Sequence, residues 1–325
     1  MTARDPGPGA SRALPRGADD ARERAAGGPD TGERVGSARR VRPLDAARAA
    51  EGVYAATGVR LTVEGPCGGG EVGAAYVRWQ DGHRSVLTWR PDTSVAALRA
   101  GPLAVCELLR GDGFPCPATE LAARTGNAAV IVQEVLPGRA VRRFTRTALD
   151  RALALSESMA GRLAGRPDIP RVGLHLQDDG PGFCLHGPLR EHSRRTAALE
   201  RRVRAVAAGP GPPDDAVHFD FHPGNMLAAP DGSLSGVVDW DGAGRGDRRL
   251  DLVTLRFGLE GLQCEPGVVE RLDAVLDALP PAVLLPLWAH MSLRLADWAV
   301  RHHGPADVER WLDLAQTRLG PLAVS

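Results

Sequence analysis

The sequence of 325 residues predicts an α+β fold with two lobes, a small β-rich N-terminal lobe and a larger, mainly helical C-terminal lobe. Apolar and polar residues alternate as in strands between residues 60 and 90, where a hairpin turn signal stands at 80–83. Beyond residue 139 apolar residues recur mainly at helical spacing. The two patterns place an N-terminal lobe at 43–138 and a C-terminal lobe at 139–325, after a tail at 1–42.

The elements follow from local patterns. The tail is rich in Pro, Gly, Ala, Arg, Asp and Ser, cannot bury enough apolar surface to offset its ordering entropy, and is predicted to be disordered. A helix is expected to begin near residue 44. Strands are then expected at 60–63, 74–79, 85–90 and 128–135, with a helix at 94–110 before the last of them. Helices are expected at 147–163, 189–208, 266–279, 282–302 and 306–319, interrupted by a strand, loop and strand at 217–238.

Composition excludes several classes of protein. Forty acidic and forty basic residues give a formal net charge of zero, which argues against a nucleic-acid binder. All forty basic residues are Arg, so a Walker A loop and Schiff-base catalysis, which need Lys, are excluded. The five cysteines are scattered without a C-x-x-C pair, as in a reducing compartment. No apolar run approaches the ~18 residues of a membrane span. The sequence predicts a cytoplasmic protein that binds neither nucleic acid nor membrane.

The most informative stretch is HFDFHPGN at 218–225, followed by DWD at 239–241. A Pro-Gly turn separates Asp220 from Asn225 and can direct both side chains to one point. A hairpin after Asn225 is expected to return the chain so that Asp239 lies nearby. Two carboxylates and one amide supply the oxygen ligands that Mg²⁺ prefers. Phosphoryl transfer needs such a set, with a base near the acceptor hydroxyl and ligands for the metal.

A second interpretation of the same stretch is a metal hydrolase, because His218, Asp220 and His222 alternate along the chain. The Pro-Gly-Asn continuation and the later Asp-Trp-Asp fit a phosphotransferase better.

These motifs resemble those of the aminoglycoside phosphotransferase family, a branch of the protein-kinase-like fold that includes choline kinases. Its signature is His-Gly-Asp-Leu-His-Pro-x-Asn, then Asp-Trp-Glu or Asp-Trp-Asp, and a later Gly-Asp-Pro…Asp-Leu segment similar to 246–252 here. The resemblance implies that Asp220 is the catalytic base, that His218 braces its loop, and that Asn225 and Asp239 hold Mg²⁺. Phe219 stands where the family has Gly, and Arg248 where it has Pro.

The resemblance also implies a nucleotide site for ATP or GTP. Gly68, Gly70 and Gly73 form a G-x-G-x-x-G loop before a strand, as in a kinase loop that covers phosphates; an ordinary flexible loop is the alternative. Residues 131–138 resemble the family's hinge, whose backbone contacts adenine, which implicates Gln133, Glu134 and Val135. An ordinary buried strand is the alternative there.

One family residue has no counterpart. The third strand of the family carries a Lys that pairs with the phosphates and with a helix Glu. Here alternation puts Thr88 and Arg90 on one face of that strand. Arg90 is expected to replace the charge of the Lys and bind the phosphates, and the alternative is that Thr88 takes the phosphate-facing position. The Glu partner is also open, with Glu107 and Glu71 as candidates.

The predicted function is ATP-dependent phosphorylation of a hydroxyl on a small molecule, and the first candidate for this acceptor is an antibiotic. An aminoglycoside or cationic peptide antibiotic would fit the family, and its phosphorylation would give resistance or self-protection. The alternatives are a kinase for an amino alcohol or sugar and a catalytically weak, ATP-binding regulatory module. A cationic acceptor would be met by carboxylates, for which the candidates are Asp241, Glu260, Glu265 and Asp297.

Overall fold

The computed structural model describes residues 44–68 and 73–320. The predicted disordered tail at 1–42 and the predicted loop residue Gly70 lie outside the described residues.

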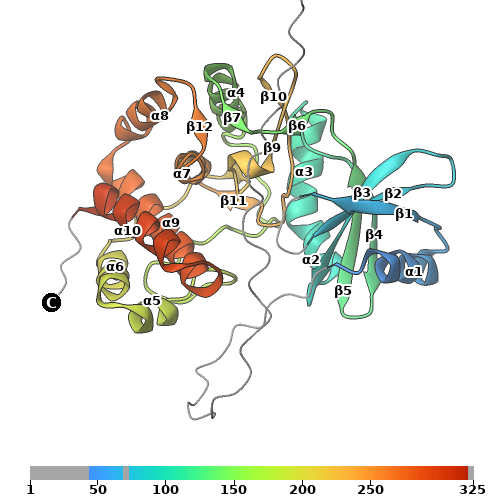
Figure 1. Ribbon diagram of the computed structural model, residues 1–325, viewed down its shortest axis with the longest axis horizontal. Helices are drawn as coiled ribbons and strands as arrows, with labels where there is room; N and C mark the ends of the chain where they lie inside the picture. Colours follow the sequence, from blue (N-terminus) through green and yellow to red (C-terminus); the bar gives the residue numbers. More distant parts are fainter. Residues whose placement is uncertain (1–43, 69–72, 321–325) are drawn as a thin grey trace, which may run out of the picture. The chain divides into compact units, whose positions relative to one another are not determined.

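The N-terminal part is built on a five-stranded antiparallel sheet with the order β1-β2-β3-β5-β4 (Figure 1). The strands are β1 (Thr62–Cys67), β2 (Ala74–Arg78), β3 (Arg84–Pro91), β4 (Thr119–Thr125) and β5 (Ala128–Glu134). The predicted hairpin joins β2 to β3, closed by a hydrogen bond from the Trp79 amide to the His83 carbonyl at 3.0 Å. Strand β4 was not predicted, because this edge strand carries Glu and Arg among short alanines and shows no clear alternation.

Helices cover both faces of this sheet. Helix α1 (Ala46–Thr57) starts at an Asp45 cap and ends at Gly58, whose φ of +76° suits glycine. It packs its alanines and a valine against Val77, Leu87, Val130 and Val132. On the other face Leu98 packs against Ala129 and Ile131.

The helix expected at 94–110 is in fact two helices, α2 (Val95–Ala100) and α3 (Pro102–Gly111). Pro102 has no amide hydrogen and disfavours helical geometry at the residue before it, so the chain breaks at Gly101.

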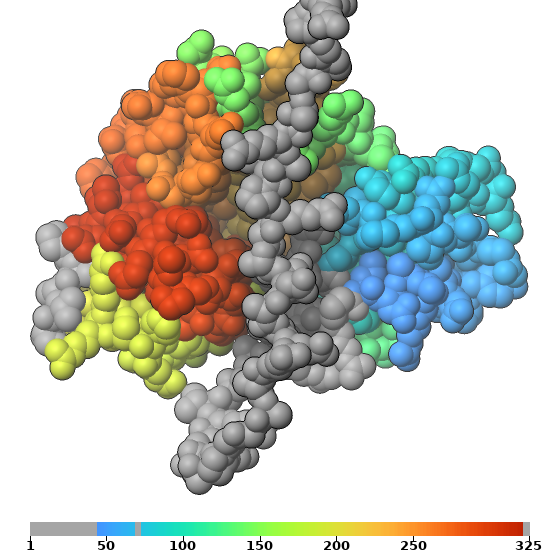
Figure 2. Space-filling view, in the orientation of Figure 1, coloured from blue at the N-terminus to red at the C-terminus, as the bar shows by residue number. Residues whose placement is uncertain are grey.

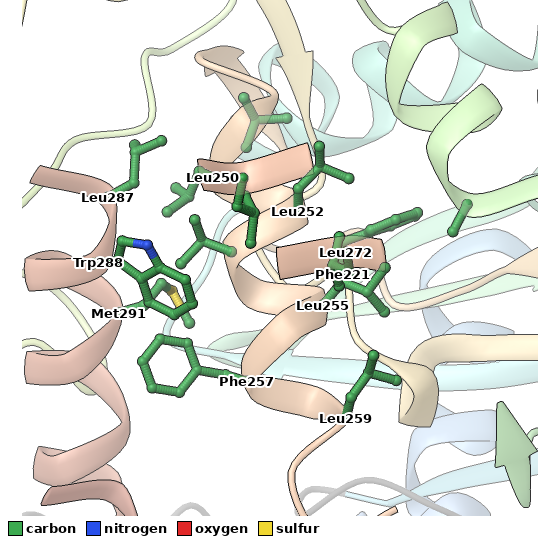
Figure 3. Packing of buried hydrophobic residues seen from close by; sticks show 14 of the residues in the cluster. Phe221, Leu250, Leu252, Leu255, Phe257, Leu259, Leu272, Leu287, Trp288 and Met291 are labelled. Carbon is green, nitrogen blue, oxygen red and sulfur yellow. The ribbon is translucent and has the colours of Figure 1, made fainter. Parts of the chain in front are cut away.

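The C-terminal part is mainly helical, as predicted. Its helices are α4 (Arg146–Ser158), α5 (Gly187–His192), α6 (Arg194–Arg204), α7 (Arg249–Gly258), α8 (Val268–Asp277), α9 (Pro281–His302) and α10 (Pro305–Leu319). The helix expected at 189–208 is divided, because Ser193 forms a capping box with Thr196 and starts α6 there. Helix α7 was not predicted. Figure 3 shows why it matters to the core: Phe257 of α7 faces Trp288 of α9, with ring centroids 5.2 Å apart.

Short strands carry the segment between α6 and α7. Strand β8 (Asp215–Val217) pairs with β11 (Gly244–Gly246), and the hairpin of β9 (Met226–Ala228) and β10 (Leu234–Val237) lies between them in the sequence. Strand β6 (Arg139–Ala140) extends that hairpin, and β7 (Arg143–Phe144) pairs with β12 (Gln263–Cys264). In Figure 2 the surface of the N-terminal sheet is blue and cyan, and the surface of α9 and α10 is red. Within the described residues no helix is long and apolar enough to cross a membrane.

Candidate active site

Two loops meet at the site, the 218–225 loop after β8 and the 239–241 segment after β10. The β9–β10 hairpin brings them together, as the sequence predicts, and the Val238 amide donates to the Asn225 carbonyl at 2.9 Å. A single 3-10 turn at Pro223–Asn225 directs the Asn225 side chain back to Asp220. The structure thus brings Asp220, Asn225 and Asp239 into one place.

Hydrogen-bond donors surround the Asp220 carboxylate. Asn225 Nδ2 donates to Asp220 Oδ2 at 3.1 Å, and His222 Nε2 lies 3.4 Å from the same oxygen. Arg294 of α9 reaches Oδ1 at 3.2 Å. Burial favours the neutral acid, but the hydrogen bond from His222 and the charge of Arg294 outweigh it and hold the pKa of Asp220 well below its usual range. Asp220 is therefore an anion with a fixed orientation.

His218 braces the loop from inside the protein, where its side chain is fully buried. Its Nε2 donates to the Val238 carbonyl at 3.0 Å, and its Nδ1 accepts from the Asp220 amide at 3.2 Å. Burial lowers the pKa of His218 to about 4, so the ring is neutral near pH 7. This geometry fits the bracing role that the resemblance implies.

Asp251, on the first turn of α7, holds the same loop and was not among the predicted site residues. Its two carboxylate oxygens accept the amide hydrogens of His218 and Phe219, each at 2.8 Å. Burial raises the pKa of Asp251 to about 7, while these two hydrogen bonds favour the anion. The sequence signal that could have identified Asp251 is the Gly-Asp…Asp-Leu segment, since a buried Asp at the start of a helix can accept backbone hydrogen bonds.

Phe219 adopts a left-handed backbone with φ of +73°. This conformation costs a non-glycine residue roughly 1–2 kcal/mol, which gives a physical reason for glycine at this position in the resembling motif. Phe219, in place of the glycine of the motif, therefore has a strained backbone, and the surrounding structure must hold it in this conformation.

Asn225 and Asp239 have the donor chemistry that Mg²⁺ requires. Asn225 Nδ2 donates to the main-chain and side-chain oxygens of Asp220, and its Oδ1 accepts no hydrogen bond from the described residues. The Asp239 side chain is 44% exposed. The pKa of Asp239 is raised above its usual range. Desolvation is the main cause and repulsion by Asp220 adds to it, while the charge of Arg90 acts in the opposite direction. Among the described residues no group of three or more His, Cys, Asp or Glu side chains could hold a metal. Nucleotide and water oxygens would therefore have to complete the shell around these two residues.

Arg90 of β3 points to the same place. Its Nη2 lies 3.4 Å from Asp239 Oδ1, and its Nε forms an ion pair with Asp241. Burial lowers the pKa of Arg90 and the charge of Asp239 raises it. Glu107 is exposed on α3, and Glu71 lies outside the described residues. Arg90 therefore has Asp239 and Asp241 as carboxylate partners in place of a helix Glu.

The remaining predicted nucleotide residues lie on the N-terminal sheet. Gly68 follows β1, and Gly73 precedes β2 with φ of +85°. Gln133 and Glu134 end β5, and Val135 follows them. The Glu134 amide donates to the Ala118 carbonyl at 3.0 Å, so this group is engaged within the protein.

The sheet-rich N-terminal part, the helical C-terminal part and the Asp-Asn-Asp set together define a kinase-like phosphotransferase. The chain belongs to the phosphotransferase enzyme family (APH), whose sequence model matches residues 66–263, more than half of its length. It is a small-molecule kinase by that membership.

Solved structures share the fold at low identity. A thermostable mutant of aminoglycoside phosphotransferase APH(4)-Ia, in complex with AMP-PNP and hygromycin B, has a TM-score of 0.55 and 14% identity, covering 84% of this chain and 98% of that chain. A proposed fructosamine-3-kinase from Thermobifida fusca has a TM-score of 0.54 and 19% identity, with the same coverage. No curated protein sequence matches this chain significantly.

The carboxylates expected to meet a cationic acceptor are all paired with arginines. Asp241 pairs with Arg90, Glu260 with Arg256 at 3.3 Å, Glu265 with Arg146 at 3.9 Å, and Asp297, fully buried, with Arg301 at 2.7 Å. Each of these four carboxylates therefore already has a cationic partner within the protein.

Proposed function

We propose that the protein transfers the γ-phosphoryl group of ATP, or of GTP, to a hydroxyl of a small molecule, with Mg²⁺ as the metal. The observation that carries this proposal is the convergence of Asp220, Asn225 and Asp239 beside Arg90. Asn225 Nδ2 lies 3.1 Å from Asp220 Oδ2, and Arg90 Nη2 lies 3.4 Å from Asp239 Oδ1.

Each residue has a separate task in the proposed reaction. Asp220 accepts a hydrogen bond from the acceptor hydroxyl and takes its proton as the new bond to phosphorus forms and the bond to the nucleotide oxygen breaks. Asn225 Oδ1 and Asp239 would hold Mg²⁺, which supplies positive charge beside the phosphates. Arg90 and the loop that contains Gly68, Gly70 and Gly73 would bind phosphate oxygens. Backbone groups near Gln133, Glu134 and Val135 would contact the base. His218 keeps the loop in shape.

For the acceptor, the first candidate is an antibiotic, whose phosphorylation would give resistance or self-protection. Membership in the family and the similarity in fold to a structure holding hygromycin B support it. Within this candidate, the cationic acceptors would be an aminoglycoside or a cationic peptide antibiotic.

The second candidate is a neutral or singly charged metabolite, such as a sugar or an amino alcohol. The arginine pairing of Asp241, Glu260, Glu265 and Asp297 favours this candidate, because a polycation would have to displace those arginines. The similarity in fold to the proposed fructosamine-3-kinase is consistent with it.

The test is phosphoryl transfer to a panel of aminoglycosides, peptide antibiotics, sugars and amino alcohols, with ATP or GTP and Mg²⁺. Mass spectrometry detects the gain of one phosphoryl group, and an Asp220→Ala variant is the control for contaminating kinases. Transfer by the wild type and not by the control supports the proposal. Nucleotide binding without transfer to any acceptor would instead favour the regulatory module. We further propose a cytoplasmic location, since all five cysteines are free thiols and the proposed donor is ATP or GTP.

A further inference from the structure

Arg294, in the middle of α9, makes three contacts with two consecutive residues of the 218–225 loop. Its Nη1 donates to the Phe219 carbonyl at 3.0 Å, and its Nη2 donates to Asp220 Oδ1 at 3.2 Å. Its guanidinium also lies over the Phe219 ring, 4.1 Å from the centroid. The side chain is only 15% exposed, so these contacts are made in a largely desolvated setting.

The Phe219 ring is enclosed on other sides as well. The ring of His290, one helical turn before Arg294 on α9, lies 5.8 Å from it. A Cβ atom added to Gly242 would stand 2.7 Å from Phe219 Cδ1, so the backbone after the Asp-Trp-Asp segment passes close to the ring. Neighbours from α9 and from the 239–242 segment therefore confine Phe219 in its left-handed conformation.

We propose that Arg294 is a positioning residue that clamps the Phe219–Asp220 segment from α9 and so fixes the Asp220 carboxylate toward the acceptor. The guanidinium is planar and forks, which lets one side chain bind a main-chain oxygen and a carboxylate oxygen together. In a motif with glycine at position 219 there is no ring for a cation to cover. The clamp is thus matched to the phenylalanine of this chain. The effect of the clamp on catalysis rests on the proposed function. The stabilising contact between Arg294 and the Phe219 ring does not depend on it.

The two Asp220 oxygens have different partners, and the clamp holds one of them. Oδ1 faces Arg294, while Oδ2 faces Asn225 Nδ2 and His222. Loss of Arg294 would leave Oδ1 without this partner and loosen the orientation of the carboxylate, which Asn225 and His222 would then hold through Oδ2 alone. A small misplacement of a reacting group can cost as much as ~10²-fold in rate. Nucleotide binding would be spared, because Arg294 contacts neither Asp239 nor Arg90 in the described structure.

The kinetic test compares Arg294→Gln, Arg294→Lys and the control Arg310→Gln, which removes an exposed arginine paired with Asp307 on α10. We expect Arg294→Gln to lower kcat about 10- to 100-fold at saturating acceptor, with the nucleotide KM unchanged. Arg294→Lys keeps the charge but not the fork, and should recover part of kcat. Wild-type kcat in Arg294→Gln, or equal losses in it and in Arg310→Gln, would overturn the proposal. If Arg294→Gln does not fold, a wild-type kcat in Arg294→Lys overturns it.

A second measurement needs no phosphotransfer. Thermal unfolding of the wild type, Phe219→Gly, Arg294→Gln and the double variant gives a mutant cycle for the two side chains. We expect Arg294→Gln to lower Tm less in the Phe219→Gly background than in the wild type, because the ring contact is already gone. If Arg294→Gln lowered Tm equally in the two backgrounds, the proposed contact between Arg294 and the Phe219 ring would be refuted. A coupled cycle in a protein that phosphorylates no acceptor would instead uphold the clamp and refute the proposed function.

Discussion

Arg90 Nη2 lies 3.4 Å from Asp239 Oδ1, and this ion pair connects β3, the central strand of the N-terminal sheet, to the segment after β10. Thr88 is on the same face of β3, opposite Ile131, but no ion pair is available to its hydroxyl. The side chain of Arg90 is 19% exposed and its Nε pairs with Asp241. Arg90 therefore lies beside Asp239, a proposed metal ligand, and this supports our proposal that Arg90 rather than Thr88 binds the phosphates.

From this pair we predict that Arg90→Ala raises the KM for ATP and lowers kcat together. One charge-assisted contact would serve both binding and alignment of the phosphates. Arg90→Lys should restore activity only partly, because an ammonium cannot bind two oxygens as a guanidinium does. Steady-state kinetics with ATP varied at saturating acceptor measures both quantities.

The rival interpretation makes the opposite prediction for the same strand. With Thr88 at the phosphate-facing position, Arg90→Ala would be nearly neutral and Thr88→Lys would raise activity. An unchanged KM for ATP in Arg90→Ala would refute the assignment of Arg90.

Asp220→Ala and Asp239→Ala should fail in different ways. Asp220→Ala is expected to lose at least ~10²-fold in kcat, the lower range for general-base catalysis, with ATP affinity retained. Asp239→Ala is expected to lose the Mg²⁺-dependent part of nucleotide binding, because it removes one of two proposed metal ligands. Calorimetric titration of ATP with and without Mg²⁺ measures the second effect. Wild-type turnover in both variants would contradict the whole site.

Much of the fold could be predicted because its signals are local. The β2–β3 hairpin has a turn signal and alternation, and α9 has helical periodicity over most of its length, although it contains Pro286. The helix breaks at Gly101 and Ser193 were missed, although both have local causes in Pro102 and in the cap of α6. Strand β4 was missed for another reason, since an edge strand with polar and short side chains has weak alternation and is fixed by pairing with β5.

The residues of the site likewise fall into those that local sequence predicts and those that it does not. Asp220, Asn225 and Asp239 lie within one loop and one hairpin, so their spacing predicts that they converge. Arg294 comes from a helix more than 70 positions later, and no feature of its local sequence distinguishes it from the other arginines of the chain. Contacts of this kind follow only from how α9 packs against the loop.

His290 gives a prediction for stability as a function of pH. It is fully buried on α9, its Nδ1 accepts from the His175 amide at 3.1 Å, and burial lowers its pKa to about 3. The unfolded chain binds a proton at this residue below its ordinary pKa of about 6.5, and the folded protein does not. Its contribution to stability is therefore complete above pH 6.5 and is lost as the pH falls toward 3.

The variant His290→Asn isolates this contribution, because Asn Oδ1 can accept the same hydrogen bond and does not titrate. The wild type should be more stable at pH 7.5, and its advantage should shrink between pH 6.5 and pH 5 by up to about 1.4 kcal/mol per pH unit. Urea unfolding of both proteins at several pH values gives the difference. A difference that is constant with pH would show that the folded protein binds a proton at His290 as readily as the unfolded chain does.

The salt dependence of acceptor binding should distinguish the two acceptor candidates. A polycation drawn in by carboxylates would bind more weakly as salt screens them, over a Debye length of about 8–10 Å. Because the candidate carboxylates are paired with arginines, we expect the KM for the acceptor to stay nearly constant between low and physiological ionic strength. Initial rates with each acceptor of the panel provide the measurement. A KM that rises with salt more steeply for the acceptor than for ATP would favour the cationic antibiotic.

Gly242 and Phe219 form a pair whose packing can be tested by compensation. A methyl group at position 242 would lie 2.7 Å from Phe219 Cδ1, and its three nearest neighbours are all atoms of Phe219. The ring cannot move aside freely, because Arg294 and His290 lie against it. Gly242→Ala should therefore destabilise the protein by about 1–3 kcal/mol, the usual cost of overpacking. In the Phe219→Gly background these three contacts are removed, and the substitution should be close to neutral. Thermal and urea unfolding of the four proteins measures the compensation, with kcat of each as a second readout. If Gly242→Ala were equally destabilising in both backgrounds, the Phe219 ring would not be the group that requires glycine at position 242.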